Sequence, residues 1–396
     1  MNLNGKRYVS KNGLHRVVDA AEVVGGERAT ALARLPLDPV LAESVGANQI
    51  ARDLFEGLTA SNTSGKLVPG VAESWKQTDP TTWVFTLRKN AAWSNGDPVT
   101  ADDFVYGWRR YLDPKTASQY ATTFAPFILN GMDVAKGTKP GTALGVKALD
   151  KYRLEVKTPS PVAFLPELMT NTQFAPNHRA TIEKFGKDWT KPGHLVGNGA
   201  FVLKDWQVNS KVVVEKNPKY WDAAAVVLTK VTFLPVEDGN ADVKLFQSGE
   251  NDYVYQLPPG TYEPLKASNP KEIKNGPMLG LRFYVINNND PVMKDVRVRK
   301  ALSMVIDRDI LAKKVTADGQ VPAYGVVVKG VSGGYPRTPS LRTPQPGIRD
   351  CSPSLPQAAR AAAHSPRLKN WVMVRLLVMA VLRPGPGRAQ AAAAEP

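Results

Sequence analysis

The chain has 396 residues, of which 43% are hydrophobic and 22% charged. This composition is typical of a globular protein, and the length indicates about two or three domains. Its 51 Lys and Arg residues exceed the 36 Asp and Glu residues by 15, and most of this surplus lies at the two ends. Residues 1–36 carry +3 and residues 331–396 carry +7, which leaves +5 for the 294 residues between them. The single cysteine, Cys351, excludes an intrachain disulfide.

The two ends differ in composition from the middle of the chain. Residues 331–396 hold 10 of the 32 prolines and offer little apolar periodicity from which a core could form. This basic Pro/Arg/Ala tail is either a disordered segment, such as an out-of-frame translation would produce, or a basic arm for nucleic acid or membrane. We favour the first. Residues 1–36 show no helical or strand pattern and no apolar run of secretion-signal length, so we expect an atypical N-terminal segment without a packed core.

The first predicted elements are a helix, a strand and a second helix. Residues 47–58 place apolar side chains at helical spacing, and residues 83–87 alternate in the manner of a strand. Thr100 and Asp103 form a capping-box pattern, which predicts a helix that ends at Asp113.

Further elements follow at irregular intervals. Residues 153–156, 211–215 and 231–234 have the pattern of short strands, and residues 295–307 have that of an amphipathic helix. Short strands interleaved with helices are typical of a mixed α/β fold.

No P-loop, dinucleotide-binding or zinc-protease motif occurs in the chain. G-x-x-x-x-G-K-[ST], G-x-G-x-x-G and H-E-x-x-H are absent. His15, His178 and His194 lie far apart without a patterned partner, so we interpret each as structural. Asp238 begins an apparent calcium loop, but Val243 occupies the position that requires glycine. We therefore expect no enzyme activity, no cofactor and no metal.

Several blocks of sequence resemble one known family. The runs Val68–Trp75, Thr82–Arg88 and Ala92–Trp108 closely resemble bacterial extracytoplasmic solute-binding proteins of the oligopeptide-binding family, family 5. Supporting blocks lie at Ile50–Leu58, Trp189–Gly193, Gly197–Phe201, Asn217–Trp221 and Asp295–Leu302. The resemblance covers about residues 37–330. It implies an α/β, periplasmic-binding-protein-like class II fold with two lobes and an extra small domain.

The resemblance also implies a division into domains. Residues 37–52 with 164–278 would form a discontinuous first lobe, and residues 53–163 would form the small domain. Residues 279–330 would begin the second lobe, which would be largely missing from a truncated chain. The two ends, residues 1–36 and 331–396, have no counterpart in the family.

The resemblance assigns ligand binding to six residues. Glu43, Ser44 and Val45 fall where the family pairs its own main chain with that of the peptide, much as an added strand would. Tyr120 falls at a pocket aromatic of the small domain, for which a plain core aromatic is the alternative. The polar wall of the cleft corresponds to Tyr255 and Gln256.

This chain departs from the family where the peptide termini would be held. The resemblance implies a strand that opens the second lobe, in which well-known members have a Cys and an acid where this chain has Gly280 and Val285. A basic residue of those members corresponds to Thr316, and no counterpart of the Asp that holds the amino terminus follows Gly330. A net hydrogen bond contributes only about 1 kcal/mol. We therefore expect peptide binding no tighter than about millimolar, near −4 kcal/mol.

The function implied by the resemblance is that of the solute-binding component of a peptide ABC importer. Such a protein captures oligopeptides in an interlobe cleft and delivers them to an ABC permease in the inner membrane. The resemblance implies a periplasmic monomer. Because no signal peptide is visible in the sequence, retention in the cytoplasm is the alternative location. A metal chelate, an opine or a murein peptide is the alternative solute. Nucleic-acid binding is the weaker hypothesis because the middle of the chain carries only +5.

Overall fold

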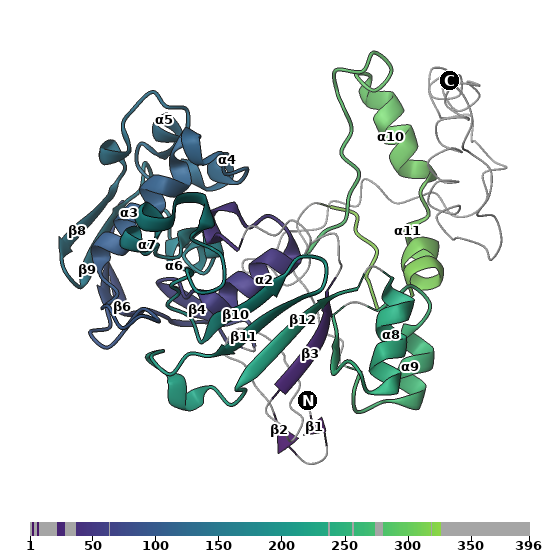
Figure 1. Cartoon of the computed structure of the whole chain (residues 1–396). Coiled ribbons are helices and arrows are strands. Elements are labelled where there is room, and N and C mark those ends of the chain that lie inside the picture. Colours follow the sequence, from purple (N-terminus) through teal and green to yellow (C-terminus); the bar gives the residue numbers. More distant parts are fainter. Residues whose placement is uncertain are drawn as a thin grey trace, which may run out of the picture. The chain divides into compact units, whose positions relative to one another are not determined.

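The computed structural model describes residues 2–3, 6–7, 22–27, 37–62, 64–236, 238–255, 257–273, 280–317 and 319–325 (Figure 1). The chain divides into two compact units. Unit 1 comprises Met1–Pro258 with Leu265–Lys274, and unit 2 comprises Pro259–Pro264 with Asn275–Pro396. No helix in the described ranges is long and apolar enough to cross a lipid bilayer.

Unit 1 contains a five-stranded sheet in the order β10-β11-β12-β3-β13. Its strands are β10 (Phe201–Gln207), β11 (Lys211–Lys216), β12 (Lys230–Pro235), β3 (Glu22–Glu27) and β13 (Tyr253–Val254). β10, β11 and β12 pair antiparallel, whereas β3 is parallel to both β12 and β13. Figure 1 shows β10, β11, β12 and β3 side by side. The strands predicted at 211–215 and 231–234 are confirmed.

Strand β3 corrects the expectation for residues 1–36. We predicted no strand there, but Glu22–Glu27 pairs along its whole length with β12 and also pairs with β13. The pattern is hard to read because Gly25-Gly26 interrupts the apolar run and because both partners lie far along the chain. Two further short strands, β1 (Asn2–Leu3) and β2 (Lys6–Arg7), pair with each other. The tail at 331–396, which we expect to lack a core, lies outside the described residues.

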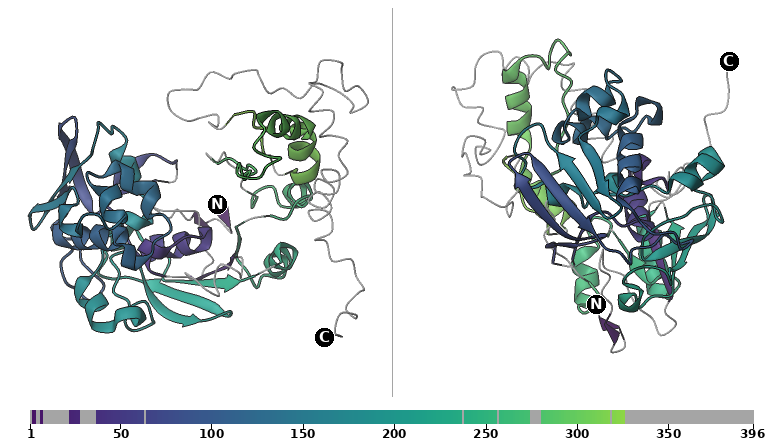
Figure 2. Two further views of the ribbon diagram at one scale, coloured as in Figure 1. Left: turned by 90° about the horizontal axis from the view of Figure 1, so that it is seen from above. Right: turned by 90° about the vertical axis from the view of Figure 1, so that its left-hand side faces the viewer.

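The second sheet of unit 1 is antiparallel and has the order β6-β7-β9-β8. Its strands are β6 (Ala72–Asp79), β7 (Thr82–Leu87), β9 (Arg153–Lys157) and β8 (Val146–Asp150). The alternation that predicts β7 is confirmed, because Trp83, Phe85 and Leu87 are all buried. In Figure 2 the strands of this sheet are blue, whereas β10, β11 and β12 of the five-stranded sheet are teal.

Two longer helices connect these sheets to the rest of the core. Helix α3 (Ala101–Leu112) begins at the predicted capping box and buries Phe104, Trp108 and Tyr111. Helix α2 (Val45–Leu54) is shorter than predicted, because Phe55 adopts extended backbone with φ −133°. The N–H of Gly199 donates to the Leu54 carbonyl at 2.9 Å, so another segment closes against the end of α2.

The remaining elements of unit 1 are short. A small two-stranded sheet pairs β4 (Thr59–Ser61) with β5 (Leu67–Pro69). The helices are α4 (Ala121–Phe124), α5 (Gly131–Ala135), α6 (Leu165–Leu168), α7 (Arg179–Phe185) and α8 (Gly239–Ser248), with α9 (Tyr262–Ser268) at the boundary between the units. Unit 1 contains residues 37–52, the predicted small domain and most of 164–278, whereas residues 259–264 and 275–278 fall in unit 2. The division of unit 1 into a lobe and a small domain stays a prediction.

The regular elements in the described part of unit 2 are helices. It contains α10 (Val296–Val305), α11 (Arg308–Ile310) and a π-helix, η8 (Leu311–Thr316). The helix predicted at 295–307 is confirmed, with Asp295 as its N-cap. Residues 280–287 form no strand, although the resemblance placed the first strand of the second lobe there. A strand requires a hydrogen-bonded partner, and the described part of unit 2 contains no strand that could pair with these residues.

Candidate functional site

Three of the predicted site residues lie where the chain enters helix α2. We call Ala42–Val45 the Glu43 segment. Its backbone is extended at Ala42 (φ −68°, ψ 112°) and at Ser44 (φ −87°, ψ 161°). Ser44 is the N-cap of α2, because its Oγ accepts a hydrogen bond from the Ala47 N–H at 3.1 Å. Glu43 is exposed, as is Val45 at 59%. The segment thus presents extended backbone at the surface of unit 1.

Side chains from two other parts of unit 1 donate to the backbone of this segment and of the residues just before it. Gln173 of the 3₁₀ helix η5 (Thr172–Phe174) donates from Nε2 to the Ala42 carbonyl at 2.8 Å. Ser118 donates from Oγ to the Val40 carbonyl at 2.7 Å. Because both donors point at main-chain oxygens, they fix the course of the backbone without contacting the exposed side chains.

An ion pair fixes the base of the same region. Buried Asp38 pairs with the guanidinium of Arg110 on α3. Arg110 Nη1 also donates to Asn177 Oδ1 at 3.1 Å, and the guanidinium lies 5.7 Å from the centre of the Trp189 ring. Removing either partner would leave a buried charge uncompensated, which is strongly destabilising. The pair therefore ties the residues before the Glu43 segment to α3.

Tyr120 lies next to the Glu43 segment. It immediately precedes α4, and its hydroxyl donates to the Glu43 carbonyl at 3.4 Å. The side chain is 38% exposed, which argues against the alternative of a plain core aromatic. Buried Tyr111 of α3 donates its hydroxyl to the Tyr120 carbonyl at 2.6 Å, so the position of Tyr120 is also fixed by hydrogen bonding.

The backbone of Glu43 has capacity for further hydrogen bonds. Among the described residues, none accepts from the Glu43 N–H, and its carbonyl receives the long bond from Tyr120. An extended backbone with an open N–H and an accessible C=O is what an added peptide strand pairs with. The group formed by Glu43, Ser44, Val45 and Tyr120 is our candidate binding site.

The other predicted site residues are not joined to this group. Tyr255 follows β13 and is exposed, and no hydrogen bond or ring contact within the described residues links it to Glu43 or Tyr120. Gln256 lies outside the described residues. In unit 2, Val285 is exposed, and the Thr316 hydroxyl donates to the Ala312 carbonyl at 3.1 Å. Neither side chain can carry a charge.

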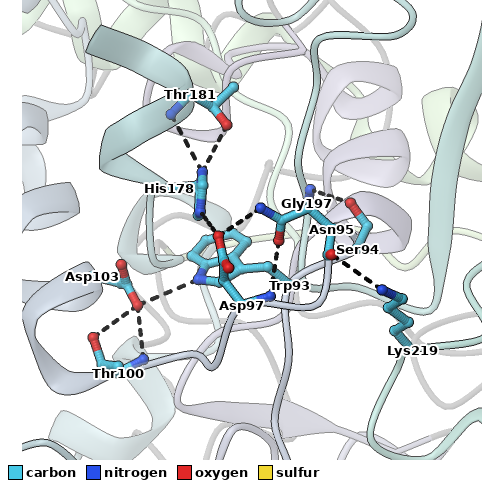
Figure 3. Close-up of polar contacts among 10 residues, drawn as sticks. All are labelled: Trp93, Ser94, Asn95, Asp97, Thr100, Asp103, His178, Thr181, Gly197 and Lys219. Carbon is cyan, nitrogen blue, oxygen red and sulfur yellow. Dashed lines mark hydrogen bonds and ion pairs between the residues drawn. The ribbon is translucent and has the colours of Figure 1, made fainter. Parts of the chain in front are cut away.

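A second polar cluster surrounds His178 (Figure 3). The side chain is buried, and its Nε2 lies 3.0 Å from Asp97 Oδ2. Its Nδ1 accepts from the Thr181 N–H at 3.3 Å and lies 2.7 Å from Thr181 Oγ1. The Trp93 ring packs edge-on against the imidazole, with centroids 5.1 Å apart. Sequence patterns missed this cluster because Asp97 precedes His178 by 81 positions.

The order Asp97, His178, Thr181 has the connectivity of an acid–base–nucleophile triad. Thr181, however, is only 5% exposed, and its N–H and hydroxyl both face His178 Nδ1 at the beginning of α7. A substrate therefore has no access to the hydroxyl. We interpret the cluster as structural: His178 caps α7 and links it to the turn that contains Asp97.

Neighbouring contacts in Figure 3 extend this structural role. Asp103 accepts from the Thr100 N–H at 2.7 Å, from the Thr100 hydroxyl at 2.9 Å and from Trp93 Nε1 at 3.3 Å. Burial raises the pKa of the Asp103 carboxyl, and these hydrogen bonds oppose the rise. On another face of the same turn, Lys219 Nζ donates to the Asn95 carbonyl at 3.1 Å. Asp103 therefore caps α3, as predicted.

No metal centre is present among the described residues, since no group of three or more His, Cys, Asp and Glu side chains could hold an ion. The apparent calcium loop at Asp238 has a different role. Its carboxylate accepts from the Asn240 N–H at 2.7 Å and from the Ala241 N–H at 3.4 Å, which makes it the N-cap of α8.

Comparisons with known proteins agree with this fold. The chain is 47% identical over 291 residues to the periplasmic oligopeptide-binding protein OppA of Escherichia coli K12, covering 73% of this chain and 54% of that protein. It is 43% identical over 306 residues to the periplasmic murein peptide-binding protein MppA of the same strain, covering 77% and 56%. The chain spans about half the length of the curated relatives it matches.

Solved structures of OppA and MppA proteins are also similar to this chain. The structure of OppA from Burkholderia pseudomallei matches with a TM-score of 0.78 at 41% identity, covering 90% of this chain and 67% of that one. The structure of the Escherichia coli murein tripeptide-binding protein MppA matches with a TM-score of 0.76 at 40% identity, covering 81% and 62%. The predicted α/β fold is thereby confirmed. A model of bacterial extracellular solute-binding proteins, family 5 (Middle), matches residues 66–366, and the chain belongs to this family.

Proposed function

We propose that the chain is the solute-binding component of a peptide ABC importer and that it holds an oligopeptide by its main chain along the Glu43 segment. The observation that carries this proposal is the open, extended backbone of Glu43 beside the half-exposed ring of Tyr120. Main-chain hydrogen bonds do not depend on the identity of ligand side chains. Relatives named as oligopeptide-binding and murein peptide-binding proteins support the same ligand class.

The family supports a proposal for the partner and the compartment. The relatives in Escherichia coli are named as periplasmic proteins, which supports a periplasmic location and an ABC permease of the inner membrane as partner. We further propose a monomer that neither transforms its ligand nor binds nucleic acid. In support, Thr181 of the one triad-like cluster described above is inaccessible.

The test is a set of chemical-shift titrations of the 396-residue chain with trialanine, triserine and trialanine N-methylated at its central residue. We expect the two unmethylated peptides to bind within about threefold of each other, no tighter than about millimolar. The N-methylated peptide should bind more weakly, because it has lost a main-chain donor. A tenfold preference between the unmethylated peptides, or indifference to methylation, would contradict main-chain recognition.

A murein peptide is the second candidate ligand, favoured by the identity with MppA. Competition separates the two candidates. If the site prefers ordinary peptides, a murein tripeptide should displace trialanine only at higher concentration; displacement at several-fold lower concentration would favour the murein peptide.

A further inference from the structure

Gln173 contacts the candidate site without being part of its surface. The side chain is 3% exposed and donates to the Ala42 carbonyl at 2.8 Å. That carbonyl belongs to the peptide group that also contains the open N–H of Glu43. We propose that Gln173 is a positioning residue, which orients this peptide group so that the Glu43 N–H faces the ligand. This inference rests on the proposed function.

The geometry of the peptide bond carries the argument. A trans peptide group is planar, so its C=O and N–H point in opposite directions. Gln173 holds the Ala42 carbonyl toward the interior of unit 1. The Glu43 N–H therefore points outward, in keeping with its lack of a partner among the described residues. One buried hydrogen bond thus determines the direction of a donor on the surface.

Thr172, the residue before Gln173, supports the 44–45 peptide group through Asn48. The Thr172 hydroxyl donates to Asn48 Oδ1, which directs Asn48 Nδ2 toward the Glu43 segment. Asn48 Nδ2 donates to the Ser44 carbonyl at 2.9 Å. By the same planarity, the Val45 N–H points away from Asn48, and the first N–H groups of a helix have no intrahelical acceptor. Donors two residues apart on one edge match the pairing pattern of an extended strand.

Asn48 does not replace Gln173. Its Nδ2 also approaches the Ala42 carbonyl, but at 3.4 Å, which is longer than the 2.8 Å of the Gln173 bond. Without Gln173, the 42–43 peptide group would keep only this long contact. Its plane could then rotate, and the Glu43 N–H would spend less time in the orientation that binds. The ligand would have to restore that orientation on binding.

The test compares Gln173→Met, which keeps the length of the side chain and removes the donor, with the unmodified chain. Chemical-shift titration with trialanine gives the dissociation constant, and urea unfolding gives the stability. We expect the dissociation constant to rise about fivefold or more, the effect of losing one net hydrogen bond to the ligand. Gln173→Asn, which is too short to reach Ala42 but keeps a buried amide, should weaken binding in the same way and serves if Gln173→Met does not fold.

Asn217→Leu is the matched control. Asn217 is fully buried and donates from Nδ2 to the Gly199 carbonyl at 2.9 Å, the same kind of bond at a different place in unit 1. This variant should lose comparable stability and bind trialanine as the unmodified chain does. Unchanged binding by the Gln173 variants, or equal weakening by Asn217→Leu, would overturn the inference while the proposed function stands. If the unmodified chain itself fails to bind trialanine, the proposed function fails, and the inference fails with it.

Discussion

Asp242 on α8 shows how burial controls a single ionisable residue. Its side chain is 6% exposed, and Asn251 Nδ2 donates to its Oδ1 at 2.5 Å. Burial raises the pKa of Asp242 to about 6, although the Asn251 hydrogen bond acts in the opposite direction. In the unfolded chain an Asp ionises near pH 3.9. The folded state is thus destabilised progressively as the pH rises from about 4 to about 6.

We therefore expect Asp242→Asn to raise the free energy of unfolding at pH 7 by about 1–3 kcal/mol. The amide is neutral, and its oxygen can still accept from Asn251. At pH 4 the gain should largely disappear, because Asp242 is then protonated in the folded state. Urea unfolding at pH 4 and pH 7 measures both values. A variant that is less stable than the unmodified chain at pH 7 would show that the charge is compensated.

Residues of the candidate binding site were predicted only where a resemblance placed them. Glu43 and Tyr120 were assigned to one site by resemblance, and the structure places them in contact across 77 positions of sequence. Spacing alone gives no such information, because contacts between distant segments depend on the tertiary fold. For the same reason spacing revealed no partner for His178, although Asp97 lies 3.0 Å away. Gln173 gave no signal in the sequence, since its partner is a main-chain carbonyl.

At the scale of elements, local patterns predicted most strands and helices of the core but not all their ends. The capping box at Thr100 and the alternation over 83–87 were sufficient, because both signals are local. Helix α2 ends four residues before its predicted end at 58. There the Gly199 N–H, from a distant segment, donates to the Leu54 carbonyl. Strand β3 was missed because its stability comes from parallel pairing with β12 and β13 rather than from its own sequence.

The cap of α7 is a feature of an element that can be tested by two substitutions. His178→Ala removes both the cap acceptor for the Thr181 N–H and the contact with Asp97. His178→Asn removes the contact with Asp97 but supplies a favourable N-cap side chain. We expect the Ala variant to lose about 1 kcal/mol more unfolding free energy than the Asn variant, as measured by urea unfolding. Equal losses would show that the cap contributes nothing.

At the scale of the whole molecule, the core of unit 1 and residues 280–287 of unit 2 differ in how their aromatic side chains are protected. In unit 1, Phe85, Trp93 and Phe104 are fully buried. In unit 2, Phe283 and Tyr284 are 72% and 59% exposed, in a segment without secondary structure. Proteases cleave exposed backbone that lacks hydrogen-bonded structure.

We accordingly expect chymotrypsin to cleave after Phe283 or Tyr284 before it cleaves within residues 80–110. Mass spectrometry of the first fragments provides the measurement. Early cleavage inside 80–110 would contradict the packing of the four-stranded sheet described here.

The class of fold was predictable at this scale because mixed short strands and helices, together with ordered sequence blocks, indicate it. Residues 280–287 show where such a prediction fails. The resemblance implied a strand, but its formation depends on partners that the described part of unit 2 does not provide. A pattern specifies a strand only when the rest of a sheet is available to pair with it.

The central claim is that a peptide binds along the backbone of the Glu43 segment. The most direct measurement is a titration of the isotope-labelled chain with trialanine, in which the amide resonances of Glu43, Val45 and Tyr120 are followed. We predict that these resonances shift together and saturate with one dissociation constant, no tighter than about millimolar. His178 and Asp242, which lie outside the site, should show no comparable shift. Binding that shifts other residues and leaves Glu43 and Val45 unchanged would contradict the account.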